Sequence, residues 1–165
     1  MKKTVIIFGT STGTCEDLAG RIGAKLGVDN VINVTDLDES VIADNDNLIL
    51  GTSTWGAGEL QDDWYDGLNT IAAADLSGKT VALFGCGDSE SYPDTFVGGM
   101  SELYNAVKNA GANIVGAVPT DGYTFDDSES VVDGNFVGLA LDEVNEDDKT
   151  DERINAWVEQ ISQSL

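Results

Sequence analysis

Apolar residues occur along this chain in two alternating patterns. Short apolar runs lie at 5–8, 31–34, 47–51, 80–85 and 112–116, and stretches of mixed polarity separate them. Continuous runs of this length are typical of strands that are buried on both faces of a parallel sheet. The sequence therefore predicts five parallel strands with helices between them.

Helical spacing occurs in several of the connecting stretches. The apolar stripes are Leu18, Ala19, Ile22 and Leu26; then Leu103, Val107 and Ala110; and finally Ile154, Trp157, Val158 and Ile161. Residues 62–71 predict a further, less regular helix. Gly111 is expected to end the helix that contains Leu103, Val107 and Ala110. Thr150 is expected to be the N-cap of the last helix. Strands alternating with helices predict an α/β fold with helices on both faces of the sheet.

Residues 117–137 interrupt this alternation. The segment is rich in acidic residues and glycine, and residues 136–141 after it are again apolar and strand-like. We expect a fifth strand that is split by an insertion. Three aromatic residues, Tyr123, Phe125 and Phe136, favour an ordered insertion over a disordered linker. Since no domain boundary is apparent, residues 1–165 predict a single domain.

Three of the expected strands end in loops of glycine and small polar residues. The first loop, 10–15, leads directly into a helix, so its backbone N–H groups are expected to bind an anion such as a phosphate. The second and third loops, 52–59 and 85–93, each contain one large aromatic residue, Trp55 or Tyr92. Ligands of parallel sheets bind at the carboxyl ends of the strands, so the two aromatics together suggest a flat ligand between them. Each aromatic taken alone is more often explained by ordinary loop packing. Trp64 and Trp157, at helical positions, are expected in the core.

The composition narrows the possible functions. Thirty acidic and eight basic residues give a formal charge of −22, which disfavours nucleic acid and anionic membranes as partners and favours basic proteins, although solubility or a salty habitat also explains it. The chain contains no histidine, which excludes Ser-His-Asp and Cys-His catalysis and the usual zinc sites. Cys15 and Cys86 form no C-x-x-C motif, and no apolar run can span a bilayer, so a cytoplasmic protein is expected.

The three loops together resemble those of the flavodoxins. Residues 10–15 are similar to the phosphate loop T/S-x-T-G-x-T, with Cys15 in place of the final hydroxyl residue. Residues 53–60 resemble P-T-W-x-x-G-E-L, with Ser53 in place of proline, and residues 85–88 followed by Tyr92 resemble G-x-G-D…Y. The insertion and the stretches 134–143 and 153–158 resemble the long-chain subgroup.

This resemblance implies a doubly wound three-layer sandwich, with a five-stranded parallel sheet of order 2-1-3-4-5 whose fifth strand is interrupted. It also implies non-covalent FMN, with its flavin ring between Trp55 and Tyr92. The residues expected to bind the cofactor are Thr10, Ser11, Thr12, Gly13, Thr14, Cys15, Ser53, Thr54, Trp55, Gly56, Ala57, Gly58, Cys86, Gly87, Asp88, Tyr92 and Thr95. The peptide between Gly56 and Ala57 is expected to flip when the flavin takes up one electron.

The function implied by the resemblance is low-potential one-electron transfer between redox proteins, without a substrate of its own. We expect partners with basic faces, no binding to nucleic acid or membrane, and a monomer. A response-regulator receiver lacks its aspartate here, because Thr52, Ser53 and Thr54 follow the third strand, and a P-loop hydrolase lacks its lysine after Gly13. An FMN-dependent NAD(P)H:quinone reductase on the same fold remains the alternative.

Overall fold

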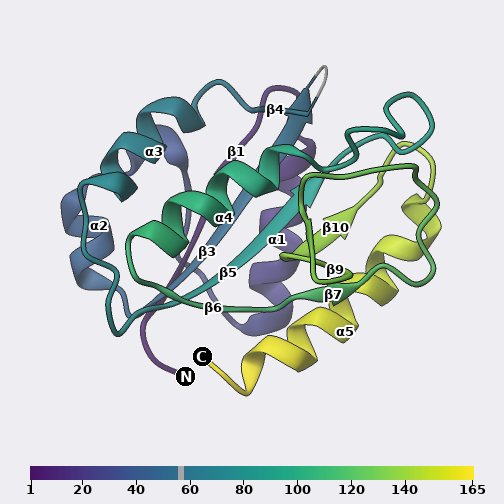
Figure 1. The fold of residues 1–165 in the computed structure, drawn as a ribbon. Helices are drawn as coiled ribbons and strands as arrows, with labels where there is room; N and C mark the ends of the chain where they lie inside the picture. Colours follow the sequence, from purple (N-terminus) through teal and green to yellow (C-terminus); the bar gives the residue numbers. More distant parts are fainter. Residues whose placement is uncertain (56–57) are drawn as a thin grey trace.

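A parallel sheet forms the centre of the molecule (Figure 1). The computed structural model describes every residue except Gly56 and Ala57, and of Trp55 it describes the backbone alone. Along the sheet the order is β10-β5-β3-β1-β2, and the long strands are β1 (Thr4–Gly9), β3 (Asn47–Trp55) and β5 (Thr80–Cys86), with β2 (Val31–Asn33) at one edge. These strands pair in parallel, with β5 as the fourth main strand, which confirms the predicted order 2-1-3-4-5.

The fifth strand is divided in two, as predicted. Both β6 (Asn113–Val115) and β10 (Leu139–Leu141) pair in parallel with β5, β6 with its first half and β10 with its second. The insertion between them forms a separate antiparallel sheet of β7 (Val118–Pro119), β9 (Asn135–Phe136) and β8 (Val131–Val132). The apolar run 136–141 therefore contributes residues to two sheets: Phe136 belongs to β9 of the small sheet, and residues 139–141 form β10 of the main sheet.

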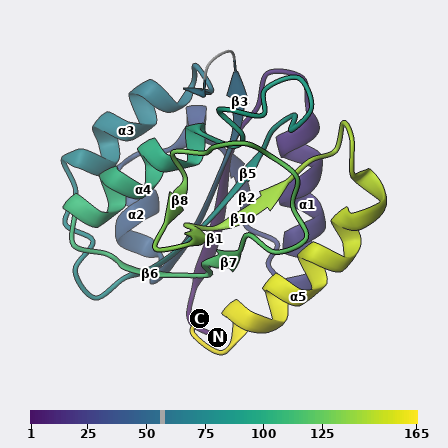
Figure 2. The ribbon, with the colours of Figure 1, turned by 45° about the vertical axis from the view of Figure 1, so that its right-hand side comes forward.

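Helices cover both faces of the sheet (Figures 1 and 2). On one face, α1 (Thr14–Leu26) and α5 (Thr150–Ser162) share a core with Ile6 and Ile49. On the other, α3 (Trp64–Ala72) and α4 (Gly99–Asn109) share a core with β1, β3 and β5. Trp64 and Trp157 are 0% and 1% exposed, so both are core residues as predicted.

Three short elements lie between the main strands and helices. These are the 3-10 turn η1 (Val34–Asp36), the helix α2 (Glu39–Asp44) and the strand β4 (Glu59–Leu60), which pairs antiparallel with the end of β3. None of the three was predicted from the sequence. Gly111 adopts a φ of 89° after α4, which is the left-handed conformation expected of a glycine that ends a helix.

The predicted capping role of Thr150 is wrong. A 3-10 turn, η2 (Asp147–Lys149), runs into α5, and Lys149 before the helix already has helical angles, φ −97° and ψ −9°. An N-cap side chain needs an extended backbone to reach the first free N–H groups, and Thr150 lies one residue too far into the helix. Its hydroxyl is buried without a hydrogen-bond partner in the described part of the chain.

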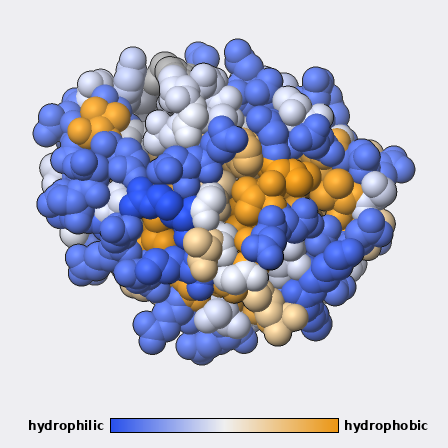
Figure 3. Space-filling model, turned by 180° about the vertical axis from the view of Figure 1, so that it is seen from behind, coloured by the Kyte–Doolittle hydropathy of each residue, from blue (hydrophilic) through white to orange (hydrophobic). Residues whose placement is uncertain are grey.

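The two termini lie side by side at the end of the sheet where β1 begins, away from the carboxyl ends of the strands (Figures 1 and 2). Seen from behind, the surface is mostly hydrophilic, with several apolar patches separated by polar side chains (Figure 3). Among the described residues, no helix has both the length and the apolar character needed to cross a bilayer.

Candidate functional site

A cavity of about 310 Å³ lies at the carboxyl ends of the parallel strands. It is lined by Thr12, Thr14, Ser53, Thr54, Cys86, Gly87, Asp88, Tyr92, Glu143 and Val144. The structure thus brings residues of all three predicted loops to one site. Glu143 and Val144, which follow β10, line the same cavity and were missed by the sequence analysis.

The first loop presents the N-terminus of α1 to this cavity. Gly13 precedes the helix with a φ of 91°, and no side chain caps the first turn. The hydroxyl of Thr10 instead accepts a hydrogen bond from the Gly13 N–H, 3.0 Å, which closes the loop on itself. The hydroxyls of Thr12 and Thr14 are 3.4 Å apart at the cavity. Free N–H groups at a helix N-terminus bind anions, so the geometry fits a phosphate.

No lysine or arginine occurs among the described residues that line the cavity. An anion bound there would be held by backbone N–H groups, by hydroxyls and by the helix dipole. Arg21, about two helical turns along α1, is already paired with Glu143 at 2.8 Å and with Asp151 at 2.6 Å. Its charge therefore fixes Glu143 at the cavity rim and is not free for an anion.

Gln61 supports the first loop from below and was not predicted. Its side chain is 2% exposed, and its Nε2 donates to the Thr10 carbonyl at 3.3 Å and to the Ser11 hydroxyl at 3.2 Å. Its Oε1 accepts from the Asp63 N–H at 3.0 Å. A Cβ at Gly9 would lie 2.4 Å from Cδ1 of the buried Trp64 ring and 2.6 Å from this oxygen, so only glycine fits there. Gln61 therefore positions the loop without lining the cavity.

Cys15 is placed differently from its loop neighbours. It is fully buried in the first turn of α1, and it does not line the cavity. A hydrogen bond with the side chain of Cys86, together with burial, raises the pKa of the Cys15 thiol well above its ordinary value. The two cysteines, far apart in the sequence, thus meet as free thiols, of which Cys86 lines the cavity and Cys15 does not.

The second loop is held by the start of α4. The hydroxyl of Thr54 accepts a hydrogen bond from the Gly99 N–H at 3.1 Å. Gly58 has a φ of 87°, and a Cβ there would lie 3.3 Å from the Cβ of Thr95. Thr95 therefore packs against this loop and does not line the cavity. The side chain of Trp55, and the expected flip between Gly56 and Ala57, lie outside the described residues.

The third loop contributes an exposed aromatic ring and a carboxylate. Tyr92 is 48% exposed at the cavity, as expected of a side chain that covers a flat ligand. Asp88 accepts hydrogen bonds from the Ser91 N–H at 3.0 Å and from Asn145 Nδ2 at 2.8 Å. These two bonds, the Ser91 bond first, hold the pKa of Asp88 below its usual value, so its carboxylate is ionised near neutral pH.

A buried carboxylate, Asp142, joins this loop to the end of β10. It is 0% exposed and accepts hydrogen bonds from the N–H and the hydroxyl of Ser89 and from the N–H of Asn145. The side-chain amide of Asn145 bridges Asp142 and Asp88. The third loop is thereby anchored to the residues that follow β10.

The insertion braces the residues that follow Tyr92. The N–H groups of Asp126 and Asp127 donate to the Pro93 carbonyl at 2.8 and 2.9 Å. The hydroxyls of Ser128 and Ser130 donate to the carbonyls of Phe96 and Val97. The predicted aromatic anchors pack around Phe96, with ring centroids 5.7 Å from Phe125 and 5.9 Å from Phe136.

Comparison with known proteins decides the family. The family model described as flavodoxin matches residues 6–157. This chain belongs to the flavodoxin family. It is 43% identical to the flavodoxin of Helicobacter pylori, over 100% of this chain and 99% of that protein, and 42% identical to flavodoxin 1 of Azotobacter vinelandii, over 96% and 94%. The crystal structure of Fusobacterium nucleatum flavodoxin bound to flavin mononucleotide superposes with a TM-score of 0.93 at 33% identity, covering 100% of this chain and 99% of that one.

Val144 lines the cavity although it lies outside the stretches that resemble flavodoxin motifs. It is apolar, 68% exposed, and stands among acidic neighbours at the cavity rim. The only feature of the sequence that could have indicated Val144 is that it is the single apolar residue in the acidic stretch 142–148.

Proposed function

We propose that this flavodoxin binds FMN non-covalently in the cavity between its three loops and carries single electrons between redox proteins. The observation that supports this most directly is the meeting of an uncapped helix N-terminus with an exposed tyrosine in one cavity. The phosphate would lie on residues 10–15, and Tyr92 would cover the flavin ring. Thr12, Thr14, Ser53 and Thr54 would supply hydroxyls, and residues 86–88 would supply backbone groups.

Bound FMN supplies the redox chemistry, because its ring takes up and releases one electron at a time. The chain contributes position and electrostatics. Asp88 and Glu143 place carboxylates at the cavity, and a net charge of −22 surrounds it, so added negative charge on the ring is disfavoured. This supports a low reduction potential.

The partners follow from the same charge. We infer that they are redox proteins with basic faces, because a strongly negative field attracts such surfaces and speeds their association. We also infer that the protein acts as a monomeric single domain and that it works in the cytoplasm, as two free, buried thiols suggest.

The experiment is to purify the protein, record its visible spectrum and titrate the FMN-free form with FMN. A yellow complex with one FMN per chain is expected. A colourless protein that does not bind FMN would contradict the proposal.

A second measurement separates an electron carrier from an FMN-dependent quinone reductase. The holoprotein should oxidise NADH in the presence of a quinone only when a separate reductase is added. Turnover without the reductase would favour the enzyme.

A further inference from the structure

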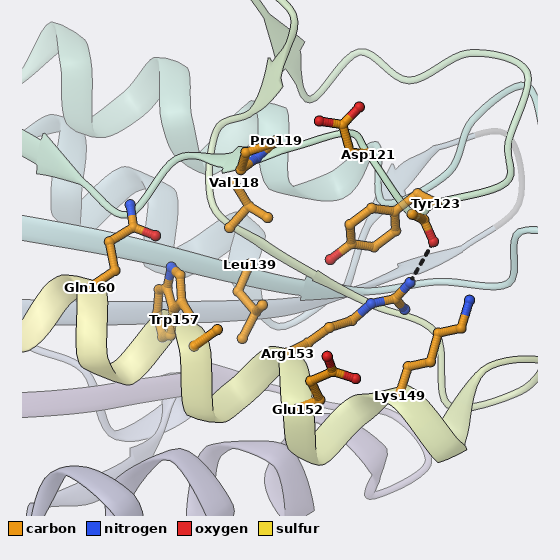
Figure 4. Close-up of a pocket in the computed structure, with 12 residues that line it drawn as sticks. Val118, Pro119, Asp121, Tyr123, Leu139, Lys149, Glu152, Arg153, Trp157 and Gln160 are labelled. Atoms are coloured by element: carbon orange, nitrogen blue, oxygen red, sulfur yellow. Dashed lines mark hydrogen bonds between the residues drawn. The ribbon is translucent and has the colours of Figure 1, made fainter.

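A second cavity, about 520 Å³ in volume, lies between the insertion and α5 (Figure 4). It shares no lining residue with the candidate FMN site. Its size is in the range of small-molecule sites, which is roughly 300–1,000 Å³. The proposed electron transfer makes no use of it.

The inner wall of this second cavity is apolar. Leu139 and Trp157 are each 1% exposed, and Val118 packs against both hydrophobic cores. The indole N–H of Trp157 already donates to the Gly116 carbonyl at 2.9 Å, so this side chain presents no free polar group to the cavity. In Figure 4, Val118, Leu139 and Trp157 lie next to one another and together form this wall. Such a wall suits an aliphatic or aromatic body.

One end of the cavity carries positive charge. The guanidinium of Arg153 lies 3.9 Å from the centre of the Tyr123 ring, and its Nη2 donates to the Gly122 carbonyl and to Glu146, both at 3.2 Å. Lys149 Nζ contacts the other oxygen of Glu146 at 2.8 Å. Two cations thus share one carboxylate, and Nη1 of Arg153 is buried without an acceptor in the described part of the chain.

This end is unusual in a chain with eight basic and thirty acidic residues. The two acidic residues that line the cavity, Asp121 and Glu152, are exposed, and the Asp121 carboxylate points away from the cavity in Figure 4. Burial raises the pKa of Tyr123 to about 12, so its hydroxyl, which donates to the Ala140 carbonyl at 2.7 Å, stays neutral. Glu152, whose carboxylate lies beside Arg153 in Figure 4, forms no ion pair with Lys149 or Arg153 in the described part of the chain, so both cations are paired with Glu146 alone.

We propose that this second cavity binds a small molecule with an apolar body and one carboxylate. The body lies against Val118, Leu139 and Trp157. The carboxylate lies at the end formed by Lys149 and Arg153, where it offsets the cation that Glu146 leaves unbalanced. The insertion then has a function of its own in addition to bracing the FMN site.

The test uses the FMN-loaded protein, so that the FMN site is occupied. Titration with 2-naphthoate, followed by calorimetry, is expected to show one site per chain. Naphthalene-2-carboxamide has the same body without the charge and is expected to bind about tenfold more weakly, which corresponds to ~1.4 kcal/mol. No saturable binding of the carboxylate at millimolar concentration, or equal binding of the two compounds, would overturn the proposal.

Two variants locate the ligand. Lys149→Gln should weaken naphthoate binding several-fold and leave the carboxamide unaffected, whereas Ala156→Phe, which fills the cavity from α5, should abolish both. Lys108→Gln on α4 is the matched control, since it removes a lysine on the opposite face of the sheet. An unchanged FMN spectrum shows that each variant is folded. Naphthoate binding that survives Ala156→Phe would place the site elsewhere and refute the proposal.

Discussion

At the scale of single residues, the FMN site depends on side chains that do not line it. Gln61 is the clearest case, because its buried amide holds Thr10 and Ser11 in place. We expect Gln61→Leu to weaken FMN binding about fivefold, which corresponds to the ~1 kcal/mol that one hydrogen bond contributes. Fluorescence titration of the FMN-free protein measures this change.

Riboflavin provides the control for Gln61. It lacks the phosphate, so its affinity should be nearly the same in Gln61→Leu as in the unmodified protein. Gln163→Leu, at an exposed position, should change neither affinity. Equal losses for FMN and riboflavin would show that Gln61 does not act through the phosphate loop.

Cys15 and Thr12 form a matched pair in the first loop. Cys15 is buried against Cys86, so Cys15→Ala should lower the free energy of unfolding by about 1 kcal/mol and leave the FMN dissociation constant unchanged. Thr12 lines the cavity, so Thr12→Ala should raise that constant several-fold with little effect on stability. The reverse pattern in urea unfolding and FMN titration would contradict this placement of the two side chains.

At the scale of elements, the third loop depends on the carboxylate that follows β10. Asp142→Ala removes the acceptor of Ser89 and Asn145 and leaves buried donors unpaired, which costs about 1–3 kcal/mol in the free energy of unfolding. FMN affinity should fall as well, because Asp88 loses its link through Asn145. Asp148→Ala, at an exposed position, is the control, and an equally small effect of both substitutions would refute the role of Asp142.

The start of α5 should show a defined pH dependence. Lys149 first, and then Arg153, hold the pKa of Glu146 below its usual value. A lowered pKa in the folded state means that the charged form stabilises the fold above the ordinary pKa of glutamate, roughly 4.3, and that this contribution is lost as the pH falls through the lowered value.

Glu146→Gln isolates this contribution. The difference in unfolding free energy between the unmodified protein and the variant should be largest near pH 7 and should shrink as the pH falls below about 4.3. Urea unfolding of both proteins at several pH values measures it. A difference that is independent of pH would show that the ion pairs of Glu146 contribute nothing.

Much of the fold was predictable at this scale. The apolar runs located all the main strands, because a strand buried on both faces needs continuous apolar sequence. The six residues of α2 were missed because they are too few to show a helical period, and β7, β8 and β9 because each contains two residues. The predicted role of Thr150 was wrong because nothing in the sequence indicates the turn η2, which makes the chain helical before Thr150 is reached.

The site was predictable only in part, for a different reason. Loops that end parallel strands must meet at one edge of the sheet, so Thr12, Asp88 and Tyr92 could be grouped from the sequence. The contacts of Gln61 with the first loop, and of Cys15 with Cys86, depend on how side chains pack across the sheet. No spacing along the chain encodes such contacts, and Glu143 and Val144 reach the cavity only because the divided strand ends beside it.

At the scale of the whole molecule, the net charge of −22 opposes compaction. Salt screens this repulsion, with a Debye length of about 10 Å at 0.1 M. We therefore expect the free energy of unfolding to rise as sodium chloride increases from about 10 mM to about 200 mM. Tetramethylammonium chloride should act similarly if screening is the cause, whereas a rise with sodium alone would indicate specific cation binding.

The neighbouring chain ends allow the connectivity of the molecule to be changed. Because Met1 and Leu165 lie side by side, a short linker could join them, and new ends could be opened at the exposed turn around Gly134 in the insertion. A circular permutant of this kind keeps every strand pairing of the main sheet and leaves the three loops untouched. It would also move the points of attachment for a fused redox partner from the far end of the sheet to the insertion, which braces the residues that follow Tyr92.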